Sequence, residues 1–245
     1  MSTEMLCDIG HIEILKPQYS ADVVNERAHG SRRSSSSSSG SSSRRESKEL
    51  TRQALVKAAL KLLSKNSFDS ISLREITREA GITPTAFYRH FDDTEELGLV
   101  LVDESFSSLR EMMRVARADP SMFQDAIHRS IEVLQEHVRA YEGHMRFIAR
   151  ERHGGVRRLR RAIRRGLEQF GDELAVDLAA FPIVGDWSVD DRRMFSSLIV
   201  ETMVAMAGEL IDASRGEEAT ITARTEAQMR LIFVGVPGWR PARNT

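Results

Sequence analysis

Residues 72–97 read SLREITREAGITPTAFYRHFDDTEEL, and this stretch contains two closely spaced helix starts. Ser72 stands three residues before Glu75, the spacing of a capping box, and the helix that it opens is expected to end at Gly81. A second short helix begins directly after this glycine, with Thr83 as its N-cap and a proline at its first position. Because glycine allows a sharp reversal of the chain, the pattern predicts a helix-turn-helix.

The residues before this stretch complete a three-helix unit. From Glu46 to Leu63 the apolar residues recur at every third or fourth position, as they do in an amphipathic helix. Residues 44–93 carry ten Lys and Arg against seven Asp and Glu, a net charge of +3 in a chain whose formal net charge is -1. This unit is therefore the electropositive end of the chain, which suits phosphate binding. Its small core is expected to contain Ile76, Ala80, Ile82, Phe87 and Phe91.

No stretch after residue 46 alternates as a strand does, and the helical period continues. A longer helix is expected from Asp93, and others follow at about 121–140, 141–153, 156–180, 188–214 and 217–234. We predict an all-α chain, with an N-terminal three-helix helix-turn-helix unit and a C-terminal helical bundle for ligand binding and dimerisation. The expected segments are a disordered Ser/Arg-rich leader, the helix-turn-helix domain, the bundle and a tail, at 1–45, 46–92, 93–236 and 237–245.

The composition excludes several classes of protein. Of the 245 residues 41% are hydrophobic, which supports a core and excludes a wholly disordered chain. The single cysteine, Cys7, cannot form an internal disulfide. The apolar runs are shorter than the roughly 20 residues of a membrane span, and no signal pattern opens the chain, so we expect a cytoplasmic protein. Residues 31–45, ten serines, four arginines and a glycine, are read as a solvated leader or as a basic arm that attracts phosphates.

The quoted stretch resembles the DNA-binding signature of the TetR family of bacterial transcriptional regulators. The resemblance covers about residues 48–98 and is strongest in AGI at 80–82 and FYRHF at 87–91. It implies a regulator that binds double-stranded DNA, with Ser72 and Tyr88 at the positions of phosphate contacts. The positions of base contacts hold Arg74, Pro84 and Thr85. The full set expected at the DNA is Lys48, Ser72, Arg74, Thr83, Pro84, Thr85, Tyr88 and Arg89.

One position departs from the family, and a longer run resembles a subgroup of it. The family often has a lysine at the position of Thr94, so a backbone phosphate contact is missing here or reduced to a hydroxyl. TAFYRHFDDTEELGLVLVDES at 85–105, with RER at 150–152 shortly before Gly154, resembles the regulators of unsaturated fatty acid synthesis of the FabR and DesT type. That resemblance implies a repressor of lipid genes that responds to long-chain acyl-CoA or acyl-carrier thioesters.

Two features of the bundle bear on the effector. Soft methionine side chains suit a cavity for a flexible acyl chain, although methionine and phenylalanine at helical spacing also form ordinary cores. Residues 150–165 carry eight arginines and one acid, which make either a solvated helix face or a site for the phosphates of coenzyme A. The residues expected at the ligand are Phe106, Leu109, Met113, Phe147, Arg150, Arg152, Arg157, Arg161, Phe170, Met203 and Met206.

Neither catalysis nor a metal site is indicated, so we expect no enzyme activity, no metal and no cofactor. The histidines at 128, 137, 144 and 153 are nine, seven and nine residues apart, and none forms an i, i+4 pair. The chain shows no catalytic, phosphate-loop or dinucleotide motif.

A palindromic operator requires two DNA-binding heads at a fixed separation, so a homodimer is expected. The last two helices carry the apolar residues expected at its interface, which are Met194, Leu198, Thr202, Ala205, Leu210, Ile211, Ile221, Met229, Leu231 and Phe233.

Two alternatives stay open. In the first, the same scaffold is a repressor that responds to a hydrophobic drug or another lipophilic compound. In the second, the chain is an interaction protein or an acyl-CoA carrier whose helix-turn-helix no longer reads DNA. Displacement by cationic dyes would favour the first, and a lack of salt-dependent binding to upstream DNA would favour the second.

Overall fold

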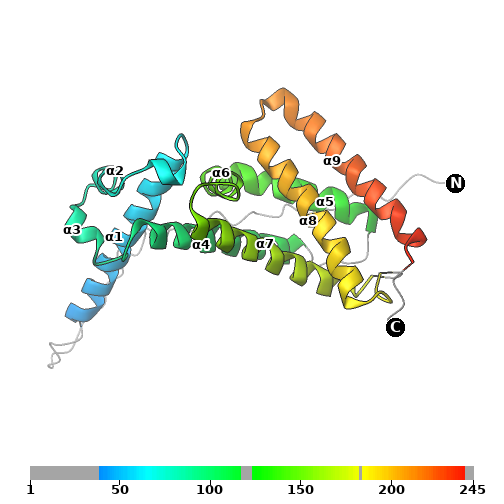
Figure 1. Ribbon diagram of the computed structural model, residues 1–245, viewed down its shortest axis with the longest axis horizontal. Helices are drawn as coiled ribbons and strands as arrows, with labels where there is room; N and C mark the ends of the chain where they lie inside the picture. Colours follow the sequence, from blue (N-terminus) through cyan, green and yellow to red (C-terminus); the bar gives the residue numbers. More distant parts are fainter. Residues whose placement is uncertain (1–38, 117–122, 182–183, 241–245) are drawn as a thin grey trace, which may run out of the picture.

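The computed structural model describes residues 39–116, 123–181 and 184–240, and every regular element in these ranges is a helix. Figure 1 shows α1, α2 and α3 grouped at one end and α5 to α9 at the other, with α4 leading from the first group to the second. The first group comprises α1 (Ser39–Leu63), the 3-10 turn η1 (Phe68–Ser70), α2 (Leu73–Glu79) and α3 (Pro84–Phe87). The second comprises α4 (Thr94–Ala116), α5 (Phe123–Ala140), α6 (Glu142–Glu151), α7 (Arg157–Leu178), α8 (Val189–Asp212), α9 (Arg215–Gly235) and η2 (Val236–Gly238). The predicted all-α class is confirmed.

The helix-turn-helix forms for the local reasons that its sequence predicts. At the start of α2 the Glu75 N–H donates to Ser72 Oγ at 3.3 Å, and the Ser72 N–H donates to the Glu75 carboxylate at 2.8 Å, which completes the capping box. Thr83 caps α3 by accepting from the Ala86 N–H at 3.2 Å. Between the helices Gly81 has a φ of 71°, which residues with a Cβ rarely adopt. Gly81 therefore turns the chain from α2 into α3.

Two boundaries differ from the prediction. α1 begins at Ser39 rather than Glu46, so the last part of the predicted disordered leader is helical, while residues 1–38 lie outside the described part. Extending an existing helix orders one residue for each new hydrogen bond, so α1 can continue into a serine run that would not start a helix itself. α3 ends at Phe87 rather than His90, because the chain tightens there and the His90 N–H donates to the Phe87 carbonyl at 2.8 Å.

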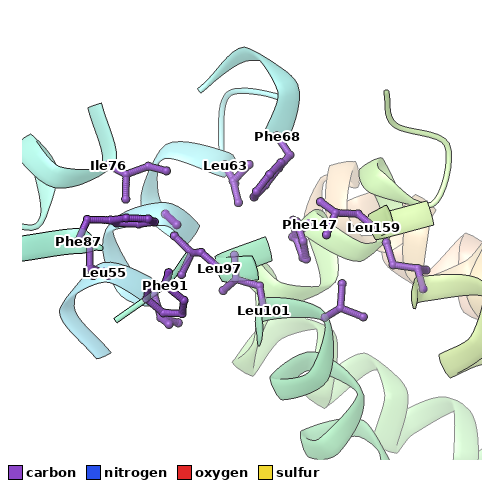
Figure 2. Close-up of a cluster of buried hydrophobic side chains, with 14 of the residues drawn as sticks. Leu55, Leu63, Phe68, Ile76, Phe87, Phe91, Leu97, Leu101, Phe147 and Leu159 are labelled. Atoms are coloured by element: carbon purple, nitrogen blue, oxygen red, sulfur yellow. The ribbon is translucent and has the colours of Figure 1, made fainter. Parts of the chain in front are cut away.

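One buried cluster joins the helix-turn-helix to the bundle. Leu55 of α1, Ile76 of α2 and Phe87 of α3 are fully buried in it. Figure 2 shows that the same cluster continues into the bundle through Leu97, Leu101, Phe147 and Leu159. Burying side chains of this size contributes about 1.5–3 kcal/mol each. The helix-turn-helix is thus packed against α4, α6 and α7, so its attachment to the bundle does not depend on α4 alone.

A second cluster fills the bundle and corrects part of the predicted dimer interface. Ile221 and Met229 of α9 are only 8% and 4% exposed, and both belong to this cluster within their own chain. They face inward because α9 packs on α8 and α5, and the helical period alone does not say which of two apolar faces is turned to the bundle. On α7 the buried side includes Leu159, Ile163 and Phe170.

The helix α8 is apolar on more than one side. By length and composition alone it could cross a membrane. In the fold it packs against α5, α6, α7 and α9, and the fully buried Ser196 lies on its inner face. Met194 and Leu198 point outward and stay 45% and 52% exposed.

Candidate nucleic-acid interface and effector cavity

The residues expected at the DNA are all exposed in the helix-turn-helix and in the preceding helix α1. None of them is covered by another part of the described chain, and in α3 only the inward-facing Phe87 is buried. Tyr88 is 60% exposed, directly after the end of α3. The exposed set is Lys48, Ser72, Arg74, Thr83, Pro84, Thr85, Tyr88 and Arg89. This set presents guanidinium, ammonium and hydroxyl donors, the groups that bind phosphates and base edges.

The Ser72 hydroxyl is already engaged in the capping box. Besides accepting from Glu75, it donates to the Glu75 carboxylate at 2.7 Å. These bonds from the Ser72 backbone and side chain lower the pKa of Glu75. Ser72 therefore fixes the start of α2, and a phosphate at this position has to share its hydroxyl with Glu75.

His90, which was not predicted as a functional residue, lies among positive charges at this end of the chain. Burial lowers its pKa first, and the charges of Lys48, Arg52 and Arg89 lower it further. Its Nδ1 is buried without a hydrogen-bond partner among the described residues. Burial and the nearby cations therefore disfavour the protonated form of His90.

The bundle contains an apolar cavity of about 430 Å³, enclosed mainly by α4 to α9. Five of the predicted ligand residues line it, namely Phe106, Leu109, Met113, Phe170 and Met203. Residues that were not predicted as ligand contacts complete the wall, among them Ile127, Ala149, Phe181, Met229 and Phe233. Ser105, Arg129, Ser130 and Asp177 provide the few polar groups. This volume lies within the roughly 300–1,000 Å³ that is typical of small-molecule sites.

Two predicted wall residues lie elsewhere. Phe147 is 1% exposed and packs in the cluster that joins the domains, where its ring lies 6.2 Å from that of Phe68. Met206, also 1% exposed, belongs to the core of the bundle. Both side chains have the type and spacing of cavity residues, but they meet neighbouring side chains instead of empty space. The interpretation as ordinary core therefore holds at these two positions.

A second hollow, of about 340 Å³, is lined by five arginines where α6 ends and α7 begins. The arginine hollow comprises Arg152, Arg157, Arg160, Arg161 and Arg164, so three of the four predicted arginines lie in it. The fourth, Arg150, points away and donates to the backbone carbonyls of Leu63 and Asn66 at 3.2 and 2.7 Å. The guanidinium groups of the hollow can donate to a phosphate from several directions at once.

The cavity and the arginine hollow follow one another along two helices. On α6, Ala149 lines the cavity and Arg152 lines the hollow. On α7, Leu167 lines the cavity and Arg164 lines the hollow. Residues three apart on a helix share a face and are separated along the axis by about 4.5 Å, a little less than one turn. An apolar compartment thus lies about one helical turn from a cationic one.

The helix-turn-helix is the part of the chain that matches a known family. Residues 55–99 match the model of the bacterial regulatory proteins of the tetR family. This range runs from α1 through the helix-turn-helix to the start of α4. The likeness to this family thus covers the helix-turn-helix and the helices that flank it. The matched range contains seven of the eight exposed residues predicted at the DNA, namely Ser72, Arg74, Thr83, Pro84, Thr85, Tyr88 and Arg89. Lys48 lies before it.

Solved structures of bacterial transcriptional regulators share the fold over about three quarters of this chain. The fatty acid degradation regulator FadR of Bacillus halodurans is 15% identical, with a TM-score of 0.61 over 78% of this chain and 97% of that one. FadR of Bacillus subtilis in complex with stearoyl-CoA is 14% identical, with a TM-score of 0.59 over 77% and 99%. NalD of Pseudomonas aeruginosa, the secondary repressor of the MexAB-OprM multidrug efflux pump, is 19% identical, with a TM-score of 0.57 over 78% and 97%. The chain therefore has a TetR-like fold, with an N-terminal helix-turn-helix and a C-terminal helical domain.

Proposed function

We propose that this TetR-family DNA-binding regulator is a homodimeric repressor of fatty acid synthesis or desaturation genes, controlled by long-chain acyl-CoA in its helical bundle. The observation that carries the proposal is the succession of the apolar cavity and the arginine hollow on α6 and α7. A ligand that fills both needs a long apolar part and several negative charges. Acyl-CoA combines an acyl chain with the phosphates of its head group.

The charge of the hollow favours a phosphate head group over a simple fatty acid. Arg152 pairs with Glu201 at 3.3 Å and Arg164 with Glu168 at 3.8 Å, so two of the five guanidinium groups are partly compensated. Within the described ranges no carboxylate forms an ion pair with Arg157 or Arg161. One carboxylate would leave most of this charge unpaired, whereas a nucleotide carrying several phosphates would neutralise it.

The outer faces of α8 and α9 support the dimer. Met194 and Leu198 of α8 and Leu231 and Val234 of α9 are all exposed, the last two by about three quarters. A contiguous apolar surface on the last two helices is typical of a protein–protein interface. A two-fold contact between these helices would set two DNA-binding heads at a fixed separation, as a palindromic operator requires. The same contact would explain why α8 is apolar on its outer side.

Native mass spectrometry of the protein as purified tests the ligand. We expect the mass of the native protein to exceed that of the chain by the mass of a long-chain acyl-CoA. If the protein is purified without ligand, we expect it to bind added oleoyl-CoA or palmitoyl-CoA. Failure to bind any acyl-CoA, together with binding of hydrophobic cations, would favour the second candidate function, which is described next.

That second candidate is a repressor that responds to a hydrophobic drug. The observation in its favour is the aromatic lining of the cavity, with Phe106, Phe170 and Phe233. Aromatic side chains bind planar hydrophobic compounds and cations as readily as acyl chains. Competition between a cationic dye and oleoyl-CoA separates the two candidates, because only the drug-responsive protein binds the dye in preference.

A further inference from the structure

The loop that lines the arginine hollow also holds the DNA-binding domain. We call residues 150–161 the joint segment, because they run from the end of α6 to the first turns of α7. Four of the five arginines of the hollow belong to it. The remaining residues of this segment include the polar groups through which the bundle contacts α1, η1 and the start of α4. One short stretch thus serves two surfaces.

Arg150 and Glu151 attach this segment to the helix-turn-helix. The Arg150 guanidinium donates to the Leu63 and Asn66 carbonyls, which the end of α1 leaves without helical partners, and its charge suits the negative end of that helix. Glu151 is 1% exposed, and its Oε1 accepts from the Phe68 N–H of η1 at 2.9 Å. The bond to the Leu63 carbonyl is partly buried and the Glu151 bond is buried, so water does not replace these two freely, while the bond to Asn66 is exposed.

Arg160 connects the hollow with the buried carboxylate. Its guanidinium lines the hollow and also donates to the backbone carbonyls of Gly154 and Gly155. Gly154 lies against Glu151 so closely that a Cβ on this glycine would overlap Glu151 Oε2. That oxygen has no hydrogen-bond partner among the described residues, whereas the Phe68 N–H donates to the other oxygen of this carboxylate, and Gly154 packs against it. A continuous set of contacts therefore runs from the hollow through Arg160, Gly154 and Glu151 to Phe68.

The charge of the hollow determines which arrangement of these contacts a bound anion would favour. Five guanidinium groups that converge on one space repel one another, and a polyvalent anion removes the repulsion. The anion therefore stabilises the arrangement in which the arginines converge. In that same arrangement Arg160 holds the glycine loop and Glu151 holds Phe68. By linkage, a ligand that favours one arrangement strengthens every contact that belongs to it.

From these contacts we infer that a nucleotide phosphate in the arginine hollow tightens the joint segment against the DNA-binding domain, with Arg160, Gly154 and Glu151 as the coupling residues. This inference rests on the proposed function, since it takes the head group of the acyl-CoA as the natural occupant of the hollow. It assigns the control of domain attachment to the head group, while the acyl chain occupies the cavity.

Hydrogen exchange of the full-length protein tests the coupling, because the Phe68 amide is itself one of the contacts. The probe is adenosine 3′,5′-bisphosphate, which carries phosphates of the coenzyme A head group without the acyl chain, and sulfate at equal ionic strength is the control anion. Exchange of the peptide that contains Phe68 should slow by about fivefold or more when the bisphosphate is bound, the lower end of couplings between two sites. Calorimetry establishes saturation in the same samples.

A glycine substitution separates binding from coupling. G154A should bind the bisphosphate with wild-type affinity, while the Phe68 peptide exchanges faster and no longer responds to the ligand. G143A is the matched control in α6, because its Cβ would lie 4.0 Å from Leu60 in ordinary contact, and it should respond like the wild type. If G154A does not fold, E151A replaces it, and E151Q, which keeps an acceptor oxygen for Phe68, should restore the response.

The outcomes that overturn the inference differ from those that overturn the proposed function. Saturating bisphosphate with unchanged exchange at Phe68, or an undiminished response in G154A, contradicts the coupling and leaves an acyl-CoA regulator in place. Binding of oleoyl-CoA without binding of the bisphosphate removes the head group from the hollow and also contradicts the coupling. Among these ligand-binding results, a failure to bind oleoyl-CoA is the one that removes the proposed function as well.

Discussion

The ring of Tyr88 stands edge-on against the buried ring of Phe87, with 5.7 Å between the ring centroids and 86° between their planes. This packing fixes the direction of Tyr88 while leaving the residue 60% exposed. The substitution Tyr88→Phe keeps the ring contact and removes only the hydroxyl. We expect the affinity for operator DNA to fall by about 1.5–3 kcal/mol, the value of a hydrogen bond to a charged group. Fluorescence anisotropy measures this loss, and an unchanged melting temperature shows that the fold is intact.

We expect substitutions of Arg74 and of Lys48 to weaken DNA binding in different ways. Arg74→Ala removes a residue expected to face bases, so binding to the preferred operator should weaken by about 1–3 kcal/mol and specificity at one position should relax. Lys48→Ala removes a residue expected at the DNA backbone, so binding should weaken about equally for all sequences and the salt slope should fall by about one. Titrations at several salt concentrations distinguish the two. An equal salt slope in all three proteins would place Lys48 away from the phosphates.

His137 makes the stability of the bundle depend on pH. Burial, and secondarily the charge of His144, lowers its pKa from 6.5 to about 4. The unfolded chain therefore binds a proton more readily, so the stabilisation is complete above about pH 6.5 and is lost as the pH falls toward 4. In His137→Phe, which keeps a ring stacked on Tyr141, up to about 3 kcal/mol of this acid loss should disappear. Urea unfolding at pH 7 and pH 4.5 measures the difference between the two proteins, and equal acid losses would contradict the assignment.

The cavity can be filled without changing the DNA-binding surface. Met203 lines it, and Met203→Trp places a large ring in the space that the acyl chain needs. We expect oleoyl-CoA to bind at least about tenfold more weakly, a loss of about 1.4 kcal/mol, while DNA binding without ligand stays the same. Met206→Leu is the control, because Met206 is buried in the core and the swap conserves volume. Calorimetry should show wild-type binding for this control, and a loss there would place the site elsewhere.

A substitution at Leu198 tests the proposed dimer interface on α8 and α9. It is 52% exposed on the outer face of α8, and Leu198→Asp would place a charge at the centre of the proposed interface. Light scattering should then find a monomer that binds a palindromic duplex much more weakly. Leu50→Asp makes the same change at another exposed leucine, on α1, and should remain dimeric. A dimeric Leu198→Asp protein would exclude this face.

The local features of the fold could be predicted from sequence, because each depends on a few neighbouring residues. The Ser72–Glu75 capping box and the Gly81 turn are of this kind. Cavity residues are different, since Phe106 lines the cavity while Phe147 is packed in a core, although both are phenylalanines on amphipathic helices. The distinction depends on what stands opposite each ring, and that is decided by other helices. For the same reason the arginine run could be noticed, but its division into the hollow and the Arg150 contact to α1 could not.

The central claim is that an acyl-CoA in the bundle changes how tightly the helix-turn-helix binds DNA. The most direct measurement is the Kd of the full-length protein for a duplex that it selects from random sequences, with and without oleoyl-CoA. The account predicts salt-dependent binding and a change in Kd of about fivefold to 150-fold with oleoyl-CoA, the usual range of coupling between two sites, and no such change with a cationic dye. A Kd that oleoyl-CoA leaves unchanged at saturation, or the lack of any selected duplex, would contradict it.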